Sequence, residues 1–312
     1  MIFVEKYNIK KVCFLLENEY LIEKCYDKCE TKKELQDNCE KAKKFLKKII
    51  WNQGELVVEY NRKYNYGRYF GNGIQSISRK IRGFLLENEN VIDIDMKNSS
   101  PSILKYLCDE YGITKTPKLD EYVYKRENVL KKNFKNREEG KKQILIATHK
   151  ENFKTSNKWL KEYNEEVSKI IKTLLKMKEF NVMLKDARKN KDDNCEGSFI
   201  SRVLSDYEFK IVNDMMKMIK NEPFSYMFDG SMFYGDKKDI NIDKLNEELQ
   251  LKWDCRHIEF CFKGIVNESN ILIPDNYQHQ NILTKIQKEN IDYEYLKEQW
   301  EDVNQYGAVK IL

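Results

Sequence analysis

The chain has 312 residues, enough for two or three packed lobes, and its 34% charged and 41% hydrophobic residues exclude wholesale disorder. Its net charge of +5 does not by itself indicate a partner. No apolar run is long enough to span a membrane and no signal-like segment opens the chain, so we expect an intracellular protein with no membrane partner.

The first 50 residues predict a mostly helical lobe, in which Thr31 and Glu34 have the spacing of a capping box. Residues 55–60 alternate like a strand, and the three glycines of 67–73 indicate a loop that lets the backbone approach something closely. A short helix is expected over 76–86. Val91 to Asp95 predicts a strand, and Pro101 fits the first turn of a helix after a serine cap.

Two helices are predicted over 120–152 and a longer one over 157–183, followed by a polar connection at 186–197. Residues 199–220 form an amphipathic pattern that leads into a β-hairpin turning at Asp229-Gly230. A helix at 242–250, a strand at 256–263 and a helical tail from about 281, including 293–303, complete the chain. Its apolar ending suits either a longer polypeptide cut here or a last strand docked on the sheet.

Positive charge is concentrated in two segments. Residues 60–86 hold six Arg or Lys and no acid, interleaved with aromatic residues, and residues 123–176 hold fifteen Arg or Lys against seven acids. Basic stretches with interleaved aromatics suit a phosphate backbone and stacked bases. The alternative is that these lysines decorate solvated helices.

The eight cysteines include no CxxC pair, which favours a reduced compartment over a disulfide framework. Four of them lie in the first 40 residues, so a zinc cluster is one interpretation. Cys25 and Cys29, at i and i+4, are interpreted more simply as one face of a helix.

Two aspartates, Asp95 at a strand end and Asp229 at a hairpin tip, lie within apolar strand sequence. Buried carboxylates are costly unless a cation or partner neutralises them, so the pair is a candidate magnesium site. Asp93 is expected on the same strand face as Asp95, because side chains alternate. For Asp229-Gly230 alone, an ordinary tight turn is the alternative.

The string GRYFGNGIQSISRKIRGF resembles the template-binding segment of superfamily A DNA polymerases, where a GR pair precedes a loop ending in Q and an R-x-I-R-x-F helix start. That family places its first catalytic aspartate about a dozen residues later, and Asp95 follows Phe84 by 11 residues. The resemblance implies that Asp95 is catalytic and Asp93 auxiliary. It also implies that the template or primer is bound by Arg68, Gln75, Arg79 and Arg82.

The same family carries R-x-x-x-K and then a tyrosine-glycine pair on its fingers helix. Arg137 and Lys141 have this spacing, and both could reach a triphosphate from one helix face. His149 and Lys150 stand where the family has the tyrosine and glycine. The resemblance implies nucleotide-binding roles for Arg137, Lys141 and His149, while a solvated basic helix is the alternative.

A glycine-initiated long helix ends at the second catalytic hairpin in that family, and Gly197 precedes Asp229 by 32 residues, a similar separation. The family's HDE triplet is here Phe228, Asp229 and Gly230, so the resemblance is to a divergent branch. The string DIDMKNSSPSIL with the FDG hairpin looks most like the transposon/virus polymerase family, a relative of single-subunit phage RNA polymerases that is often fused to a superfamily 3 helicase.

Motif A of that family favours N-x-[HS]-P after the aspartate, which Asn98, Ser100 and Pro101 match. Superfamily A DNA polymerases have a glutamate that excludes a ribose five residues after the motif A aspartate, and here that position is Ser100. A small hydroxyl leaves room for a ribose 2′-OH. The resemblance therefore implies nucleotide binding by Ser100 with weak discrimination between ribo- and deoxyribonucleotides, as in a primase.

The resemblance implies an α/β protein of the α+β type, a right-hand polymerase core with an antiparallel palm sheet. Its parts would be a small helical, thumb-like N-terminal lobe at 1–59, a palm at 60–111 and 197–265, helical fingers at 112–196 and a helical tail at 266–312. The tail would form the junction to a helicase domain.

The implied function is template-directed nucleotidyl transfer, by a DNA polymerase or primase-polymerase, in replication of a virus or mobile element. Catalytic and metal-binding roles fall to Asp95 and Asp229, with Mg²⁺ or Mn²⁺ as cofactor. Partners would be a DNA or RNA template, nucleoside triphosphates and a superfamily 3 helicase in cis or trans. Three alternatives are a catalytically degenerate module that binds single-stranded nucleic acid, a metal-dependent nuclease and a helical scaffold for protein partners.

Overall fold

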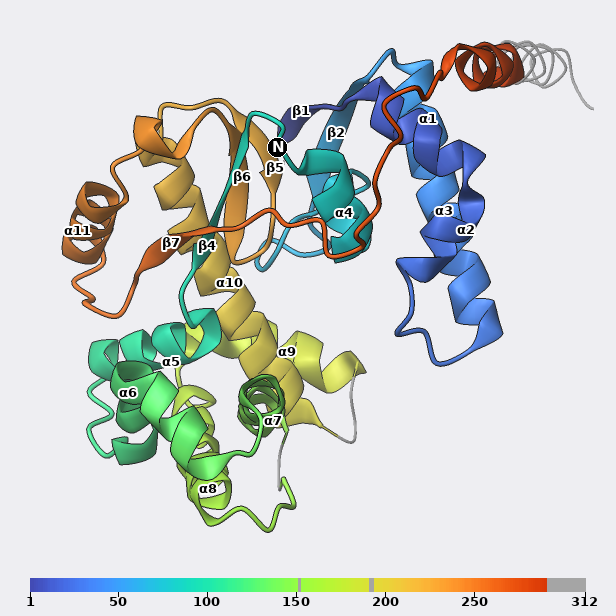
Figure 1. Cartoon of the computed structure of the whole chain (residues 1–312). Helices are drawn as coiled ribbons and strands as arrows, with labels where there is room; N and C mark the ends of the chain where they lie inside the picture. The colour runs from blue at the N-terminus through green and yellow to red at the C-terminus, as the bar shows by residue number, and fades with distance from the viewer. Residues whose placement is uncertain (151–152, 191–193, 291–312) are drawn as a thin grey trace, which may run out of the picture. The chain divides into compact units, whose positions relative to one another are not determined.

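The structure, a computed structural model, describes residues 1–150, 153–190 and 194–290 (Figure 1). It is a mixed α/β fold with antiparallel strand pairs, which confirms the predicted class. The chain divides into two compact units. Unit 1 comprises Met1–Tyr60, Phe70–Val91 and the chain from Gly264 onward, and unit 2 comprises Asn61–Tyr69 and Ile92–Lys263.

Unit 1 combines a three-stranded sheet with helices. Its sheet has the order β1-β2-β3, formed by β1 (Ile2–Lys6), β2 (Glu55–Asn61) and β3 (Phe70–Gly71). The helices are α1 (Ile9–Glu17), α2 (Glu19–Lys24), α3 (Lys32–Trp51), α4 (Arg79–Leu86) and the 3-10 turn η1 (Ile74–Ser76). Residues 280–290 are also helical.

The sequence patterns of unit 1 explain most of these elements. In β2, exposed and buried residues alternate strictly, as the sequence predicts. Thr31 caps α3, its side chain accepting the Glu34 N–H at 3.1 Å. Residues 1–50 are mostly helical, as predicted, except that residues 2–6 form a strand that pairs with β2 in antiparallel register. Cys25 and Cys29 do not share a helix face, since α2 ends at Lys24.

Unit 2 is built on a four-stranded sheet of order β5-β6-β4-β7. The strands are β4 (Val91–Met96), β5 (Pro223–Tyr226), β6 (Gly230–Tyr234) and β7 (Phe260–Lys263). The helices are α5 (Ser99–Glu110), α6 (Pro117–Asn133), α7 (Arg137–His149), α8 (Lys158–Leu174), α9 (Asn181–Asn190), α10 (Cys195–Met218) and α11 (Ile242–Lys252), with 3-10 turns η2 (Lys178–Phe180) and η3 (Lys237–Asp239).

The long helix α10 is the axis of unit 2. It packs against β6 and α11 and against the helices α5, α7 and α9, and Figure 1 shows α5 to α9 gathered around one end of it. Its buried stripe includes Phe199, Val203, Leu204 and Ile211, as predicted from the apolar spacing.

Several predicted boundaries in unit 2 are wrong. The expected helix over 157–183 is two helices, because the chain turns after Leu174. Much of the expected polar connection at 186–197 is helical, since α9 continues to Asn190. The first residue of α5 is preceded by Asn98 in the left-handed region, φ 54°, and not by a serine cap. Strand β7 is shorter than predicted.

The two units cut across the expected palm, because residues 70–91 belong to unit 1 and 92–111 to unit 2. The division into thumb-like lobe, palm, fingers and tail stays a prediction. The predicted helix at 293–303 and the apolar ending lie outside the described residues. Among the described helices, none has the length and apolar character needed to cross a bilayer.

Candidate functional site

Strand β4 supplies the first carboxylates of the candidate site. Asp93 and Asp95 lie on one face of β4, two residues apart, as predicted. Strand β7 runs antiparallel beside it, with Asp93 opposite Lys263 and Asp95 opposite Cys261. The Lys263 ammonium pairs diagonally with Asp95, Nζ to Oδ2, at 2.7 Å. The charge of Asp95 is therefore compensated by a lysine from the neighbouring strand.

The β5–β6 hairpin brings Asp229 to the same place. The Met96 N–H donates to the Asp229 carbonyl at 2.8 Å, so the hairpin turn is bonded to the end of β4. Gly230 approaches β4 so closely that a Cβ there would lie 2.9 Å from the Asp95 Cα and closer still to the Ile94 carbonyl oxygen. The turn also holds Phe228 at φ 63°, a conformation that is rare for a bulky residue.

Asp95 and Asp229, separated by 134 positions in the sequence, thus lie side by side in the structure. Burial, together with the nearby charges of Asp95 and Glu208, raises the pKa of Asp229 to about 7, and the positive charge of Lys263 opposes this rise. Several acids in one buried place repel one another, so the site favours a bound cation or proton.

Glu208 on α10 is a buried member of this site that the sequence did not indicate. Its carboxylate accepts from Arg68 Nε at 2.5 Å and Nη2 at 2.9 Å, and from Ser99 Oγ at 2.9 Å. Its side chain is only 3% exposed. Arg68, predicted as a template-binding residue, is therefore held in a bidentate pair, and its guanidinium lies 5.2 Å from the ring centre of Phe228. The only sequence signal was an acid within the apolar stripe of α10.

The segment before Arg68 is held to the same helix. Gly67 adopts φ 83°, and its N–H donates to Asp206 at 3.0 Å. Asp206, which is buried, also pairs with Lys210 at 2.8 Å. Gly67 and Arg68, which form the GR pair, are thus held by Asp206 and Glu208 of α10.

The donors fit a magnesium ion that completes its coordination with substrate phosphates and water. Asp95 and Asp229 supply carboxylate oxygens. The raised pKa of Asp229 reflects burial and repulsion by neighbouring acids, which a bound cation would relieve. Among the described residues, no group of three or more His, Cys, Asp or Glu side chains has the arrangement of a complete metal site. This also applies to the cysteines proposed for zinc, which are all free thiols.

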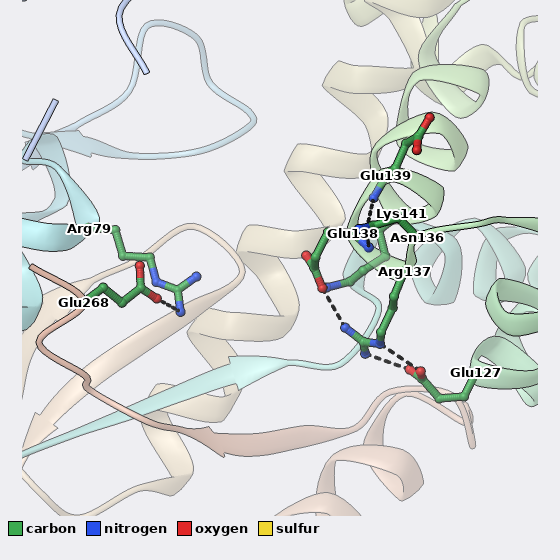
Figure 2. A network of polar contacts seen from close by, with 8 residues as sticks. All are labelled: Arg79, Glu127, Asn136, Arg137, Glu138, Glu139, Lys141 and Glu268. Atoms are coloured by element: carbon green, nitrogen blue, oxygen red, sulfur yellow. Dashed lines mark hydrogen bonds and ion pairs between the residues drawn. The ribbon is translucent and has the colours of Figure 1, made fainter. Parts of the chain in front are cut away.

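Arg137 and Lys141, predicted to bind nucleotide, lie on the exposed face of α7 and are paired with acids (Figure 2). Arg137 donates from Nε and Nη2 to Glu127 and from Nη1 to Glu138, each at 2.8 Å. Lys141 Nζ lies 2.7 Å from Glu138. Their role stays a prediction, and it would require these local pairs to open.

The other two predicted nucleotide-binding residues are partly enclosed. Burial, assisted by the positive charge of Arg68, lowers the pKa of His149 to about 4, so its imidazole is neutral at physiological pH. Its Nδ1 is buried, with no hydrogen-bond partner among the described residues. Ser100 is half-buried in the first turn of α5, next to Ser99. Arg68, which pairs with Glu208, thus also acts electrostatically on His149.

The remaining template candidates belong to unit 1. Gln75 is buried, and its Oε1 accepts the Gly71 N–H at 3.0 Å, so it shapes its own loop. Arg79, at the start of α4, pairs with Glu268 at 2.9 Å (Figure 2). Arg82 is half-buried on the same helix.

The chain is similar over part of its length to a virophage protein. No protein-family model matches the chain. The chain is 26% identical over 223 residues to the Sputnik virophage protein named "Putative helicase V13", an alignment that covers 62% of this chain and 28% of the virophage protein. The chain thus spans little more than a quarter of that relative's length, and the similarity connects it with one part of a larger virophage protein.

Proposed function

We propose that the chain catalyses template-directed nucleotidyl transfer, as a DNA polymerase or primase-polymerase in the replication of a virus or mobile element. The observation that carries the proposal is the meeting of Asp95 and Asp229 at the end of β4, with the pKa of Asp229 raised. This is the arrangement expected for carboxylates that share a cation with a phosphate-bearing substrate.

Asp95 and Asp229 would hold magnesium, and bound magnesium would supply the Lewis acidity that activates a hydroxyl for attack on an α-phosphate. Asp93, on the same face of β4, would act as the auxiliary carboxylate. Lys263 would neutralise Asp95 in the absence of substrate and offer a cation to an incoming phosphate. Glu208 would hold the Arg68 guanidinium in place beside the hairpin.

The remaining roles follow the family resemblance. Arg137, Lys141, His149 and Ser100 would contact the incoming nucleotide, and Arg68, Gln75, Arg79 and Arg82 the template or primer. The right-hand polymerase architecture of palm and fingers that the resemblance implies is part of this proposal. The small Ser100 side chain would admit ribonucleotides as well as deoxyribonucleotides.

The similarity to a virophage protein with a helicase name supports a role in replication of such an element, and supports a helicase as partner in cis or trans. The alignment covers only a part of that protein, and the proposal assigns the helicase activity its name indicates to another part.

The direct test is template-directed extension by the purified chain, with and without primer, in Mg²⁺ or Mn²⁺. Asp95→Asn and Asp229→Asn should each abolish product while retaining template binding. Asp243→Asn, which removes an exposed carboxylate from α11, is the matched control and should leave activity unchanged. Extension that survives both site variants would refute the assignment. Metal-dependent shortening of the template instead of extension would indicate a nuclease.

A single-stranded nucleic-acid-binding module is the second candidate. The observation that favours it is the engagement of Arg137 and Lys141 by Glu127 and Glu138, which leaves neither cation available to a triphosphate in this conformation. A folded chain that binds template but yields no product under any of these conditions would favour this candidate.

A further inference from the structure

A groove in unit 1 lies between α3 and the loop that follows β3. It has a volume of about 440 Å³ and is lined by Asp37, Glu40, Lys41, Lys44, Phe45, Lys48, Asn72 and Ser76. The α3 wall is the exposed side of a helix whose opposite stripe packs in the core through residues such as Ala42, Leu46 and Ile49.

Three lysines form a row along this wall. Lys41, Lys44 and Lys48 are spaced at i, i+3 and i+7, so they lie on one face of α3 over about 10 Å of its length. All three are exposed, and within the described chain they make no ion pair or side-chain hydrogen bond. Two other lysines of the helix are held in ion pairs, Lys43 with Glu19 and Lys47 with Glu289.

The opposite wall is a loop held in a fixed shape. Buried Glu5 accepts the Ile74 N–H at 2.9 Å and the Tyr60 hydroxyl at 3.0 Å, and a Cβ on Gly73 would collide with the Glu5 carboxylate. Ser76 Oγ donates to the Gly73 carbonyl at 2.9 Å. The Asn72 amide, at the exposed end of this wall, adds neutral donors to the groove.

From these observations we propose that the groove binds the phosphate backbone of a single strand of nucleic acid, along Lys41, Lys44 and Lys48. A row of about 10 Å covers roughly three successive phosphates of one strand. The unpaired ammonium groups lie on one wall of the groove and the neutral Asn72 donors on the other. This arrangement suits a polyanion whose charges repeat along a line. The choice of nucleic acid as the polyanion rests on the proposed function, whereas the groove's binding of a strand requires no catalysis.

The acids at one end of the lysine row predict an opposite effect on binding when their charge is removed. Asp37 continues the row by one turn beyond Lys41, and it is exposed and lines the groove. Glu40 is engaged by Gln36, whose Nε2 donates to it at 3.1 Å. A strand lying along the three lysines would meet the Asp37 carboxylate at that end, so removing this charge should strengthen binding.

The test measures binding of a fluorescent oligo-dT strand by anisotropy in EDTA, over rising salt, so that metal and turnover play no part. Lys41→Gln/Lys44→Gln/Lys48→Gln should weaken binding roughly tenfold and reduce the salt slope by about 2, since each single-strand phosphate contact contributes about 0.7. Asp37→Asn should strengthen binding. The matched control is Lys178→Gln/Lys185→Gln/Lys189→Gln, which removes three exposed lysines from η2 and α9, outside both basic segments, and should change affinity little.

The outcomes separate this proposal from the proposed function. Equal weakening by the α3 triple variant and the control triple variant, with equal melting temperatures, would mean that only net charge matters and would overturn the groove assignment. Displacement of the labelled strand by polyglutamate as readily as by unlabelled oligo-dT would overturn the nucleic-acid assignment and indicate an acidic protein partner. Loss of binding in the α3 variant with extension absent from the wild type would support the groove while refuting the polymerase.

Discussion

Lys263 lies opposite Asp93 in the β4–β7 register, yet its ammonium pairs with Asp95, 2.7 Å away on the diagonal. The pairing places a positive charge directly beside the carboxylate proposed to bind metal. It offsets part of the repulsion between Asp95 and Asp229, and Lys263 also lowers the pKa of Asp229.

Lys263→Met should lower the melting temperature of the metal-free protein by about 2 °C, because a half-exposed ion pair contributes about 0.5–1 kcal/mol. The stabilisation produced by added Mg²⁺ should increase, since a cation now replaces the missing ammonium. Thermal melts with EDTA and with Mg²⁺ measure both effects. Lys252→Met, which breaks the pair with Asp214 on a different surface of unit 2, is the control for a lost ion pair. An equal response to Mg²⁺ in both variants would contradict the prediction.

The raised pKa of Asp229 predicts that the stability of the metal-free protein depends on pH. Its folded-state pKa, about 7, lies above the unfolded value, so the fold binds the proton more tightly. This group therefore favours folding at low pH, and its contribution is lost as the pH rises from its unfolded pKa through about 7. Asp229→Asn should stabilise the protein at about pH 8 and have a smaller effect at about pH 5.5. Denaturant titrations at both pH values in EDTA measure the difference, and an equal effect at both would refute it.

Arg68→Lys should destabilise unit 2 by about 1–2 kcal/mol, because lysine cannot form the two-pronged contact with Glu208 and leaves that buried carboxylate partly unsatisfied. Extension activity should fall while Mg²⁺ still stabilises the protein, since neither Asp95 nor Asp229 is altered. Urea unfolding and primer extension are the two measurements. As a comparison, Arg137→Lys breaks an exposed pair and should change stability by less than about 1 kcal/mol.

Gly230→Ala should be strongly destabilising and should abolish extension. The added Cβ would lie against the Ile94 carbonyl and the Asp95 Cα, so β6 would have to move away from β4 and carry Asp229 with it. A cost of about 2 kcal/mol or more is expected for such overpacking. Gly264→Ala is the control, because its Cβ would meet only the Val266 side chain at 3.6 Å. Similar melting temperatures for the two variants would count against a close hairpin–strand contact.

Local patterns were sufficient to predict the positions of the two aspartates in their strand and hairpin. The alternation of β4 placed Asp93 and Asp95 on one face, and the Asp229-Gly230 dipeptide indicated the hairpin. Both signals lie within a few residues of the side chain concerned. The mixed fold class and the core of α10 also follow from short-range periodicity.

The partners of the aspartates could not be predicted in the same way. Lys263 is the last residue of a short strand, and its meeting with Asp95 depends on a register that joins segments 168 positions apart. Glu208 is distinguished by its contacts with Arg68 and Ser99, and the contact with Arg68 depends on the packing of the 61–69 segment against α10. Such pairings are set by tertiary structure and leave no local periodicity.

The close approach of Gly83 to the Val266 carbonyl has a consequence for the order of folding during synthesis. Any side chain at Gly83 would overlap that carbonyl, so α4 is fitted to a stretch that the ribosome makes about 180 residues later. Residues 92–263, which belong to unit 2, are synthesised after α4 and before residues 264–267. Most of the core of unit 2 can therefore form first. The surface of α4 around Gly83 stays exposed until residues 264–267 are synthesised and pack against it.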